Sequence, residues 1–313
     1  AVDGVFRLPV ERAFSIRGHG TVIAGVPIAG AVHADDEIVL LPDGLTGRIK
    51  SIQVYGQDSP TARSGQCAAI NIRHWDHRLV ERGKTVTIPG FFEPHTWCVG
   101  QVRMLPQDRL YLKHGATVRF HTGTTERLAR AYLLSGNGVA GGQTAFIQFR
   151  FDEPIVAGPR DRFIIRDLSP PRTIGGGVIL ETLARRLNRT EPGLTERLSQ
   201  QMAATSDDRS LVAFCAATMD DPLLDATMVA HRAKVPVART ASMLDQLTAA
   251  GALIRAPEGR YVHRDIADTL GRQLLARLAE HHRTTPASPG LTIEELRQAE
   301  QSSGLAPCGT GVS

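Results

Sequence analysis

Cysteine is scarce in this sequence, with only Cys67, Cys98, Cys215 and Cys308 among 313 residues. The four lie far apart and form no CxxC pair, so their spacing indicates neither a disulfide framework nor a zinc knuckle. Long apolar runs are also missing: no window approaches the roughly 18 apolar residues of a membrane span. The opening residues, AVDGVFRLPV, lack the basic-then-apolar pattern of a signal peptide. We therefore expect a cytoplasmic protein with reduced thiols and no membrane contact.

A phosphate-binding loop is missing too. The P-loop pattern GxxxxGK[ST] has no match, and its nearest approach, GLTGRIKS at 44–51, lacks the glycine-lysine pair. Three consecutive glycines, Gly175 to Gly177, run into the strand-like Val178-Ile179-Leu180 and do not open a helix. We interpret them as allowing a close backbone approach or a bulge at a barrel edge.

No catalytic constellation is evident either. There is no GxSxG elbow and no Cys/His pairing at a recognisable spacing. The stretch HWDH at 74–77 suggests a metal site, because His74 and His77 flank Asp76 closely. Since no third or fourth ligand lies nearby, a polar loop is the better interpretation. The sequence thus predicts no catalytic site, no metal and no cofactor in this chain.

Positive charge is concentrated in the first part of the chain. Residues 1–182 hold 21 Lys and Arg against 17 Asp and Glu, whereas residues 183–313 hold 15 of each. An arginine excess suits a surface that meets a phosphate backbone, because neutralised phosphates release counterions. A solvated basic face without a partner is the alternative.

The hydrophobic pattern changes once along the chain. Up to about residue 182, short segments rich in β-branched residues alternate with Gly, Pro, Asp and Ser, and the proline-containing seam IPGFFEP at 88–94 divides them into two sets. This predicts two consecutive β-barrels. Helical periodicity follows, over 211–218, 225–233 and 240–250, with Gly251 as a left-handed cap. A hairpin around 257–259 then completes the order of a winged helix.

The predicted fold is therefore a tandem of all-β barrels followed by an α+β winged-helix region. We place the first barrel at 1–90, the second at 91–182, a linker helix with the winged helix at 183–264, and the start of an incomplete second winged helix at 265–313.

Three ordered motifs carry a family resemblance. The run RFIIRD…RTIGGGVIL resembles the closing strands of the third domain of translation GTPases of the elongation factor Tu type. PGFFEPHTWCVGQVRML at 89–105 resembles the join between their second and third domains, and FSIRGHGTVIAGVPIAGAVHADDEIVLLP at 14–42 the opening of their second domain. FRLPVERAFSIRG, SIQVYGQ and the insertion in RDLSPPRTIGGG are similar to the selenocysteine-specific branch, SelB, which also carries winged helices.

The resemblance implies a function for the whole factor. It would bring selenocysteyl-tRNA to a recoded stop codon on the ribosome, as a monomer, with GTP and magnesium held in an N-terminal GTPase domain that is missing from this chain. The messenger hairpin would be bound only by winged helices beyond residue 313. The alternatives are a winged-helix DNA-binding regulator with β-barrel domains, and a barrel enzyme of unrecognised chemistry.

The resemblance also points to an aminoacyl pocket. Glu11 and Arg12 match the family's acid-arginine pair, with glutamate in the usual aspartate place, and a guanidinium suits the selenolate that selenocysteine carries at neutral pH. Cys67 stands where the family has an arginine, so either Arg73 or His19 compensates for the lost charge or selectivity is weaker. A strand-end ion pair for Glu11-Arg12 and a buried small thiol for Cys67 are the structural alternatives, and we favour the latter for Cys67.

We also predict a set of tRNA contacts. If alternate residues of 162–167 face outward, Arg162 and Arg166 share a face that could hold phosphates. Surface arginines that only aid solubility are the alternative. The helix at 237–249 offers little besides Arg239 for base edges or phosphate, so we interpret the winged helix as a spacer. The full predicted tRNA-binding set is Arg17, His19, Arg73, Arg162, Arg166 and Arg172.

Overall fold

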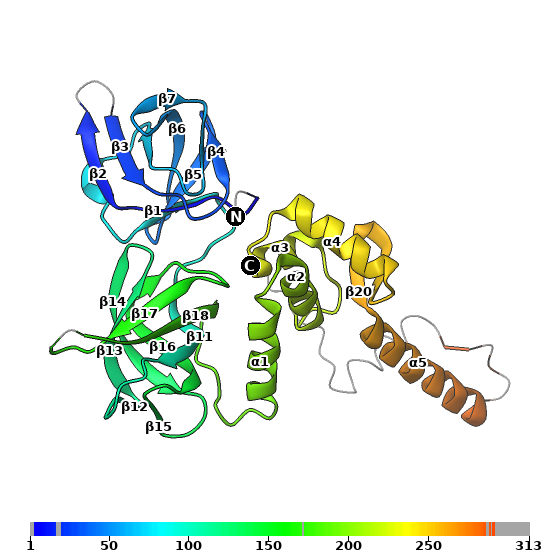
Figure 1. Cartoon of the computed structure of the whole chain (residues 1–313). Helices are drawn as coiled ribbons and strands as arrows, with labels where there is room; N and C mark the ends of the chain where they lie inside the picture. Colours follow the sequence, from blue (N-terminus) through cyan, green and yellow to red (C-terminus); the bar gives the residue numbers. More distant parts are fainter. Residues whose placement is uncertain (1–2, 17–19, 171, 286–287, 289, 292–313) are drawn as a thin grey trace. The chain divides into compact units, whose positions relative to one another are not determined.

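The computed structural model describes residues 3–16, 20–170, 172–285, 288 and 290–291. It divides into two compact units, Ala1–Leu211 with Ala233–Pro236, and Val212–Arg232 with Val237–Ser313. The first unit holds all of the β-barrel structure and the second holds helices and a small hairpin (Figure 1). None of the described helices is long and apolar enough to span a membrane.

An eight-stranded sheet forms the first part of unit 1. Its members are β1 (Arg7–Pro9), β2 (Arg12–Ile16), β3 (Gly20–Gly25), β5 (Glu37–Leu41), β6 (Leu45–Val54), β7 (Gln57–Ser59), β9 (Ala68–Ile72) and β10 (Thr85–Thr87). The order is β1-β10-β5-β6-β9-β3-β2, with β7 paired to β6. A separate pair, β4 (Ala31–His33) and β8 (Thr61–Arg63), and a short 3-10 helix, η1 (His77–Leu79), accompany it.

This sheet is a half-barrel, so of the two predicted β-barrels the first is open within the described residues. Within the described residues β1 and β2, its two end strands, do not pair with each other. They are consecutive in the chain and meet at a corner, where Val10 N–H donates to Lys84 O (2.9 Å) and Glu11 N–H donates to Ala24 O (3.1 Å). Pro9 ends β1 without an N–H to offer a neighbouring strand.

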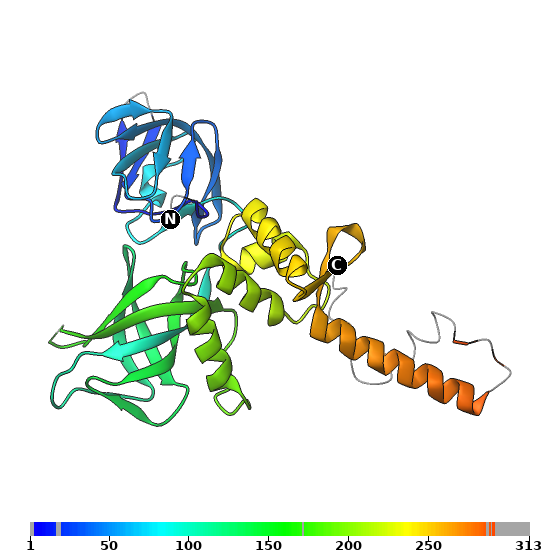
Figure 2. The same ribbon diagram turned by 45° about the vertical axis from the view of Figure 1, so that its right-hand side comes forward.

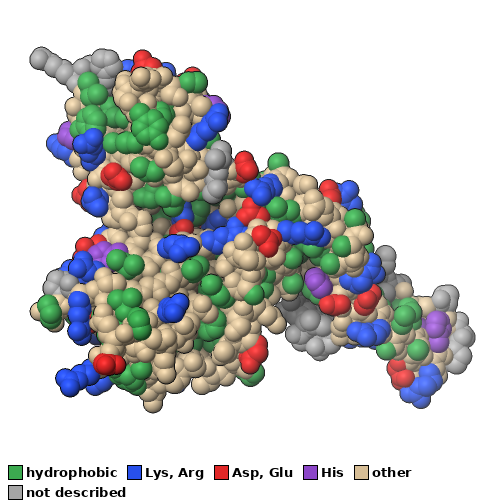
Figure 3. Space-filling view, viewed as in Figure 1, with side chains coloured by type: hydrophobic (Ala, Val, Ile, Leu, Met, Phe, Trp, Pro, Cys, Tyr) green, Lys and Arg blue, Asp and Glu red, His purple; other side chains and the backbone are tan. Residues whose placement is uncertain are grey.

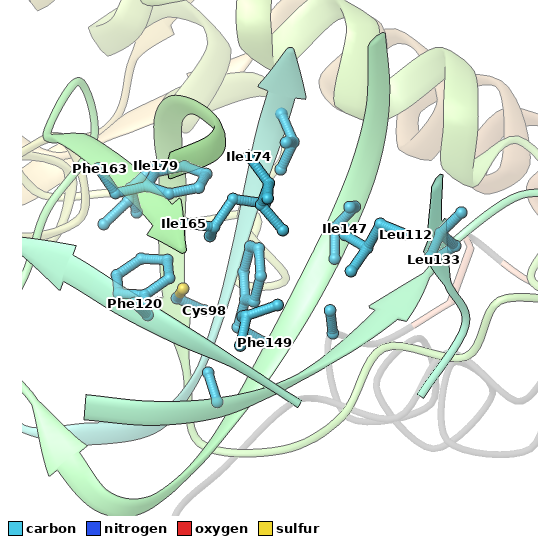
Figure 4. Packing of buried hydrophobic residues seen from close by; sticks show 14 of the residues in the cluster. Cys98, Leu112, Phe120, Leu133, Ile147, Phe149, Phe163, Ile165, Ile174 and Ile179 are labelled. Carbon is cyan, nitrogen blue, oxygen red and sulfur yellow. The ribbon is translucent and has the colours of Figure 1, made fainter. Parts of the chain in front are cut away.

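The second part of unit 1 is a closed six-stranded barrel. The strands, in order around it, are β11 (His95–Met104), β16 (Thr144–Ile155), β14 (Thr125–Leu133), β13 (Ala116–Thr122), β17 (Arg162–Arg166) and β18 (Thr173–Leu183), with β12 (Tyr111–Lys113) and β15 (Gly138–Ala140) as a side pair. Phe120 lies at the centre, with ring centroids 5.0 Å from Phe149 and 4.7 Å from Phe163 (Figure 4). Such aromatic pairs add to the stabilisation that area burial gives.

The triple glycine lies inside this barrel. Gly175 to Gly177 belong to β18, which pairs with β11 on one side and β17 on the other. A Cβ on Gly177 would lie 1.8 Å from Gln101 O, and one on Gly176 would lie 2.7 Å from Phe163 O. The glycines therefore permit close backbone approach, as predicted, but in an interior strand and not at an edge.

Contacts within unit 1 join the half-barrel to the closed barrel. The Arg7 guanidinium pairs bidentately with Asp161, with Nη1 2.6 Å from Oδ2, and lies 4.7 Å above the Phe92 ring. Thr125 Oγ1 donates to Gly83 O (2.7 Å). Helix α1 (Leu194–Ala204) packs Leu194 and Leu198 against the barrel's outer surface in one apolar cluster with Val99, Leu134 and Leu180.

Unit 2 follows the predicted order of three helices and a hairpin. These are α2 (Asp208–Ala217, whose first turn belongs to unit 1), α3 (Ala226–Ala233), α4 (Val237–Ala249), β19 (Leu253–Arg255), the 3-10 turn η2 (Pro257–Gly259) and β20 (Tyr261–His263). Gly251 has the expected positive φ of 79°. An isolated bridge from Leu224 to Tyr261 adds to the hairpin. Figure 2 shows the last helix, α5 (Arg264–Thr284), as one unbroken element.

Candidate functional site

The predicted acid-arginine pair lies at the open side of the half-barrel. Glu11 and Arg12 are both exposed, at the corner and at the start of the end strand β2. The Arg12 guanidinium lies 5.9 Å from the Phe14 ring centroid. No ion pair joins the two residues in the described structure, so Arg12 rests on an aromatic face and not on Glu11.

Arg12 shares a face with the third predicted pocket residue. The register places Arg12 opposite Ala24, and Ala24 opposite Ala69, so these three side chains share the outer surface of the sheet. Two strand spacings, about 10 Å, separate Arg12 from Ala69. Cys67 lies two residues before Ala69, on the same outward side.

The predicted burial of Cys67 is wrong, because this thiol is exposed. The reason is its position just before β9: Ala68 and Ile70 of that strand point into the core, and Cys67, one residue before Ala68, points outward. The residue therefore faces the same solvent region as Arg12, and not the apolar interior. An exposed thiol is available to a ligand, whereas a buried one is not.

Apolar side chains surround Arg12 on this face. Phe14 and Ile16, on alternate positions of β2, are 37% and 43% exposed. Figure 3 shows hydrophobic side chains gathered on this part of the half-barrel. Large exposed apolar residues on an end strand are unusual, since natural proteins protect such edges. A cation beside an apolar surface suits a ligand with an anionic head.

Tyr55 is a residue of this region that the sequence reasoning missed. It occupies the two-residue turn between β6 and β7 with φ +53°, is 70% exposed, and its N–H donates to Cys67 O (3.0 Å). A bulky residue at positive φ is an outlier, and such strain gathers at functional positions. The sequence pair Tyr55-Gly56 could have indicated this turn, because a two-residue hairpin turn usually has Asn-Gly at these positions and a tyrosine there is unusual.

The other predicted contacts are distributed over unit 1. Arg17 and His19 lie outside the described residues. Arg73, just after β9, lies 3.7 Å from Asp35 in an exposed ion pair. Because it follows β9, Arg73 is on the same sheet as Cys67 but at the opposite end of the strand.

The arginines of β17 alternate as predicted. Arg162 and Ile164 are exposed, Arg166 is half-buried, and Phe163 and Ile165 point into the core. Arg172 is exposed and ion-paired to Asp167, with Nε 2.8 Å from Oδ2. Arg162 and Arg166 therefore share the outer face of the barrel, while Arg172 has its charge partly neutralised.

In the HWDH stretch, the Asp76 carboxylate is hydrogen-bonded to its near neighbour Arg78. Asp76 caps η1 by accepting from Arg78 N–H (3.0 Å), and Arg78 Nη2 lies 2.6 Å from Oδ2 of the same carboxylate. These bonds to Arg78 lower the pKa of Asp76 to about 2. Among the described residues no group of three or more His, Cys, Asp or Glu is arranged to hold a metal ion.

Gly176 and Gly177 are packed against the Phe163 and Gln101 carbonyls, so these glycines cannot wrap a phosphate.

Comparison with known proteins agrees with this architecture. Residues 100–186, most of the closed barrel, match the family model described as the β-barrel domain of the selenocysteine-specific elongation factor. A selenocysteine-specific elongation factor of Desulfomicrobium baculatum is 32% identical over 307 residues, which cover 93% of this chain. The chain is a relative of the selenocysteine-specific elongation factors.

The match to these factors is partial in length. The aligned part covers 46% of the Desulfomicrobium baculatum protein. The factor of that name from Escherichia coli K12 is 25% identical over 207 residues, 66% of this chain and 32% of the relative. The chain therefore spans about half the length, or less, of these two selenocysteine-specific elongation factors.

Proposed function

We propose that this chain is the part of a selenocysteine-specific elongation factor that binds selenocysteyl-tRNA for co-translational selenocysteine incorporation. The complete factor would work as a cytoplasmic monomer on the ribosome, with GTP and magnesium bound by another domain and the messenger hairpin bound by further winged helices. In this proposal the chain itself binds and positions but catalyses nothing.

The observation that carries the proposal is the shared face of Arg12 and Cys67. The selenol has a lower pKa than a thiol, so the esterified residue arrives as an anion, and an exposed guanidinium can pair with it. The apolar surface of Phe14 beside Arg12 lowers the local dielectric and so strengthens that pairing. Serine, which differs only in having a neutral hydroxyl, gains nothing from the charge.

The tRNA body would lie on the closed barrel. Arg162 and Arg166 project from one outer face, as phosphate contacts require. Arg172, held by Asp167, would contribute less. Arg73 would meet the acceptor end from the half-barrel once it leaves Asp35.

The test compares two aminoacylated forms of one tRNA. Arg12→Ala should weaken filter binding of selenocysteyl-tRNA about tenfold more than that of seryl-tRNA, the loss of one charge-assisted contact. The matched control is Arg63→Ala, an exposed arginine of β8 on the same half-barrel, which should affect both forms equally and slightly. Equal losses for both tRNAs in Arg12→Ala would remove the pocket from the proposal.

A further inference from the structure

A cluster of arginines and aromatic rings lies on the outer face of the closed barrel, away from β17. We call Trp97, Arg130, Tyr132, Arg150 and Arg186 the arginine–aromatic patch. Trp97 of β11 is opposite Arg150 of β16, which is opposite Arg130 of β14, so the three form one row across neighbouring strands. Tyr132 lies two residues along from Arg130 on the same face.

Aromatic and cation–π contacts connect members of the patch. The Arg150 guanidinium lies 5.7 Å from the Trp97 ring centroid, and the Trp97 and Tyr132 centroids are 5.7 Å apart. Arg186 lies next to Tyr132, with its guanidinium 4.8 Å from the centroid of the Tyr132 ring. Cation–π contacts of this kind fix the plane of a guanidinium while leaving its N–H groups available for a ligand.

The segment that carries Arg186 is fastened to the barrel. Gln148, buried on the outer side of β16, donates from Nε2 to Leu187 O (3.1 Å) and accepts from Leu187 N–H (2.9 Å). This pair of bonds keeps the residue next to Arg186 against the sheet. The third arginine of the patch is thus positioned by a specific contact and not by a freely moving linker.

The charge of the patch is not neutralised by the protein. Among the described residues, Arg130, Arg150 and Arg186 form no ion pair with a carboxylate, and Arg150 Nη1 is buried without a hydrogen-bond acceptor. On the same barrel Arg119 is paired with Glu126 at 2.8 Å and Arg127 with Glu153 at 3.1 Å. The patch is therefore a place where three guanidinium groups gather without counter-charge.

We propose that the arginine–aromatic patch is a second RNA-binding surface, which contacts the phosphate backbone. Guanidinium groups held against aromatic rings, as those of Arg150 and Arg186 are, match phosphate geometry and lose little side-chain freedom on binding. With Arg130 beside Arg150 on the neighbouring strand, they suit consecutive phosphates of a polyanion better than a single small anion. The surface requires no aminoacyl group, so it goes beyond the pocket around Arg12 and does not depend on it.

The experiment uses the full chain and a fluorescein-labelled 24-nucleotide RNA hairpin without an amino acid. The double variant Arg130→Ala/Arg186→Ala changes two exposed side chains and leaves the half-buried Trp97, Tyr132 and Arg150 intact. We expect about tenfold weaker binding in fluorescence anisotropy and a reduction of about 1 to 2 in the slope of log K against log salt concentration. Arg103→Ala is the matched control, exposed on β11 at a distance of about 20 Å from Trp97 along the strand.

An unchanged salt slope in the double variant, or an equal loss in Arg103→Ala, would overturn the proposal. A parallel measurement with phosphatidylglycerol vesicles separates RNA from a lipid headgroup as the source of phosphate. Loss of vesicle binding with RNA binding intact would contradict the assignment to RNA. Hydrogen exchange of the β14 amides, unchanged in both variants, shows that the fold is retained.

Discussion

In the closed barrel four phenylalanine rings fill the centre, whereas in the half-barrel aliphatic side chains such as Leu8, Ile23 and Ile70 predominate, with Phe6 and Trp75 among them. The outer faces differ as well: the barrel carries arginines in rows with exposed Leu128 and Ile164 between them, and the half-barrel carries exposed Phe14 and Ile16 on its end strand. A closed sheet has no edge strand with unpaired backbone groups. The outer face of the closed barrel carries charged side chains. The open sheet instead presents an apolar edge beside Arg12, which suits recognition of a small group.

Removing a central ring of the closed barrel should destabilise that barrel and leave the half-barrel folded. Phe120→Ala deletes a fully buried ring that contacts three others, and should destabilise the closed barrel by about 4 kcal/mol. Hydrogen exchange should then show lost protection in β13, β14 and β16 and retained protection in β3 and β9. The control Leu128→Ala, at a position 51% exposed, should change little. Equal loss of protection in both sheets would mean that they unfold as one unit.

A second substitution tests how tightly the barrel is closed. Gly177→Ala places a methyl group 1.8 Å from Gln101 O, so β11 and β18 must separate, at a cost of about 3 kcal/mol. Gly271→Ala in α5, where nothing lies within 4 Å of the new methyl, should be neutral or slightly stabilising. Urea unfolding of the two variants measures both effects. Similar stabilities for the two would show that the strand pair adapts easily.

Much of this fold follows from sequence pattern. The strands, the three helices, the cap at Gly251 and the outward alternation at Arg162 were all predicted, because each depends on neighbours within a few residues. The open edge of the half-barrel was not. It depends on which strand β1 meets, and Pro9 and the corner at Val10 decide that through contacts with Lys84 and Ala24, far away in sequence.

The candidate site was predictable only in part. Arg12 was found from the family motif, but the exposure of Cys67 depends on the alternation phase of β9, and GQCAAINI alone leaves that phase open. The arginine–aromatic patch was not predicted. Trp97, Arg130, Tyr132 and Arg150 meet through the register of β11, β14 and β16, and Arg186, which follows β18, is held beside them by the bonds between Gln148 and Leu187.

Adding a positive charge at Cys67 should increase the selectivity of the half-barrel face for selenocysteyl-tRNA. Cys67→Arg adds a guanidinium on the side that carries Arg12, and should raise the preference for selenocysteyl-tRNA over seryl-tRNA about fivefold, the size of one exposed ion pair. Cys67→Ser, which keeps size and neutrality, should leave the ratio unchanged. Filter binding with both aminoacylated forms measures it. If Cys67→Arg weakened both tRNAs alike, the charge at this position would not face the aminoacyl group.

The smallest expected effect concerns the polar loop after β9. Hydrogen bonds from Arg78 hold the pKa of Asp76 at about 2 in the folded protein, below its ordinary value of 3.8. Because the folded pKa is the lower one, the carboxylate favours the folded state above pH 3.8, and this contribution is lost as the pH falls towards 2. In Arg78→Ala the pKa of Asp76 should return towards its ordinary value, which an NMR titration of the side-chain carboxyl would detect. A titration near pH 2 in that variant would show that the loop backbone, and not the guanidinium, lowers the pKa.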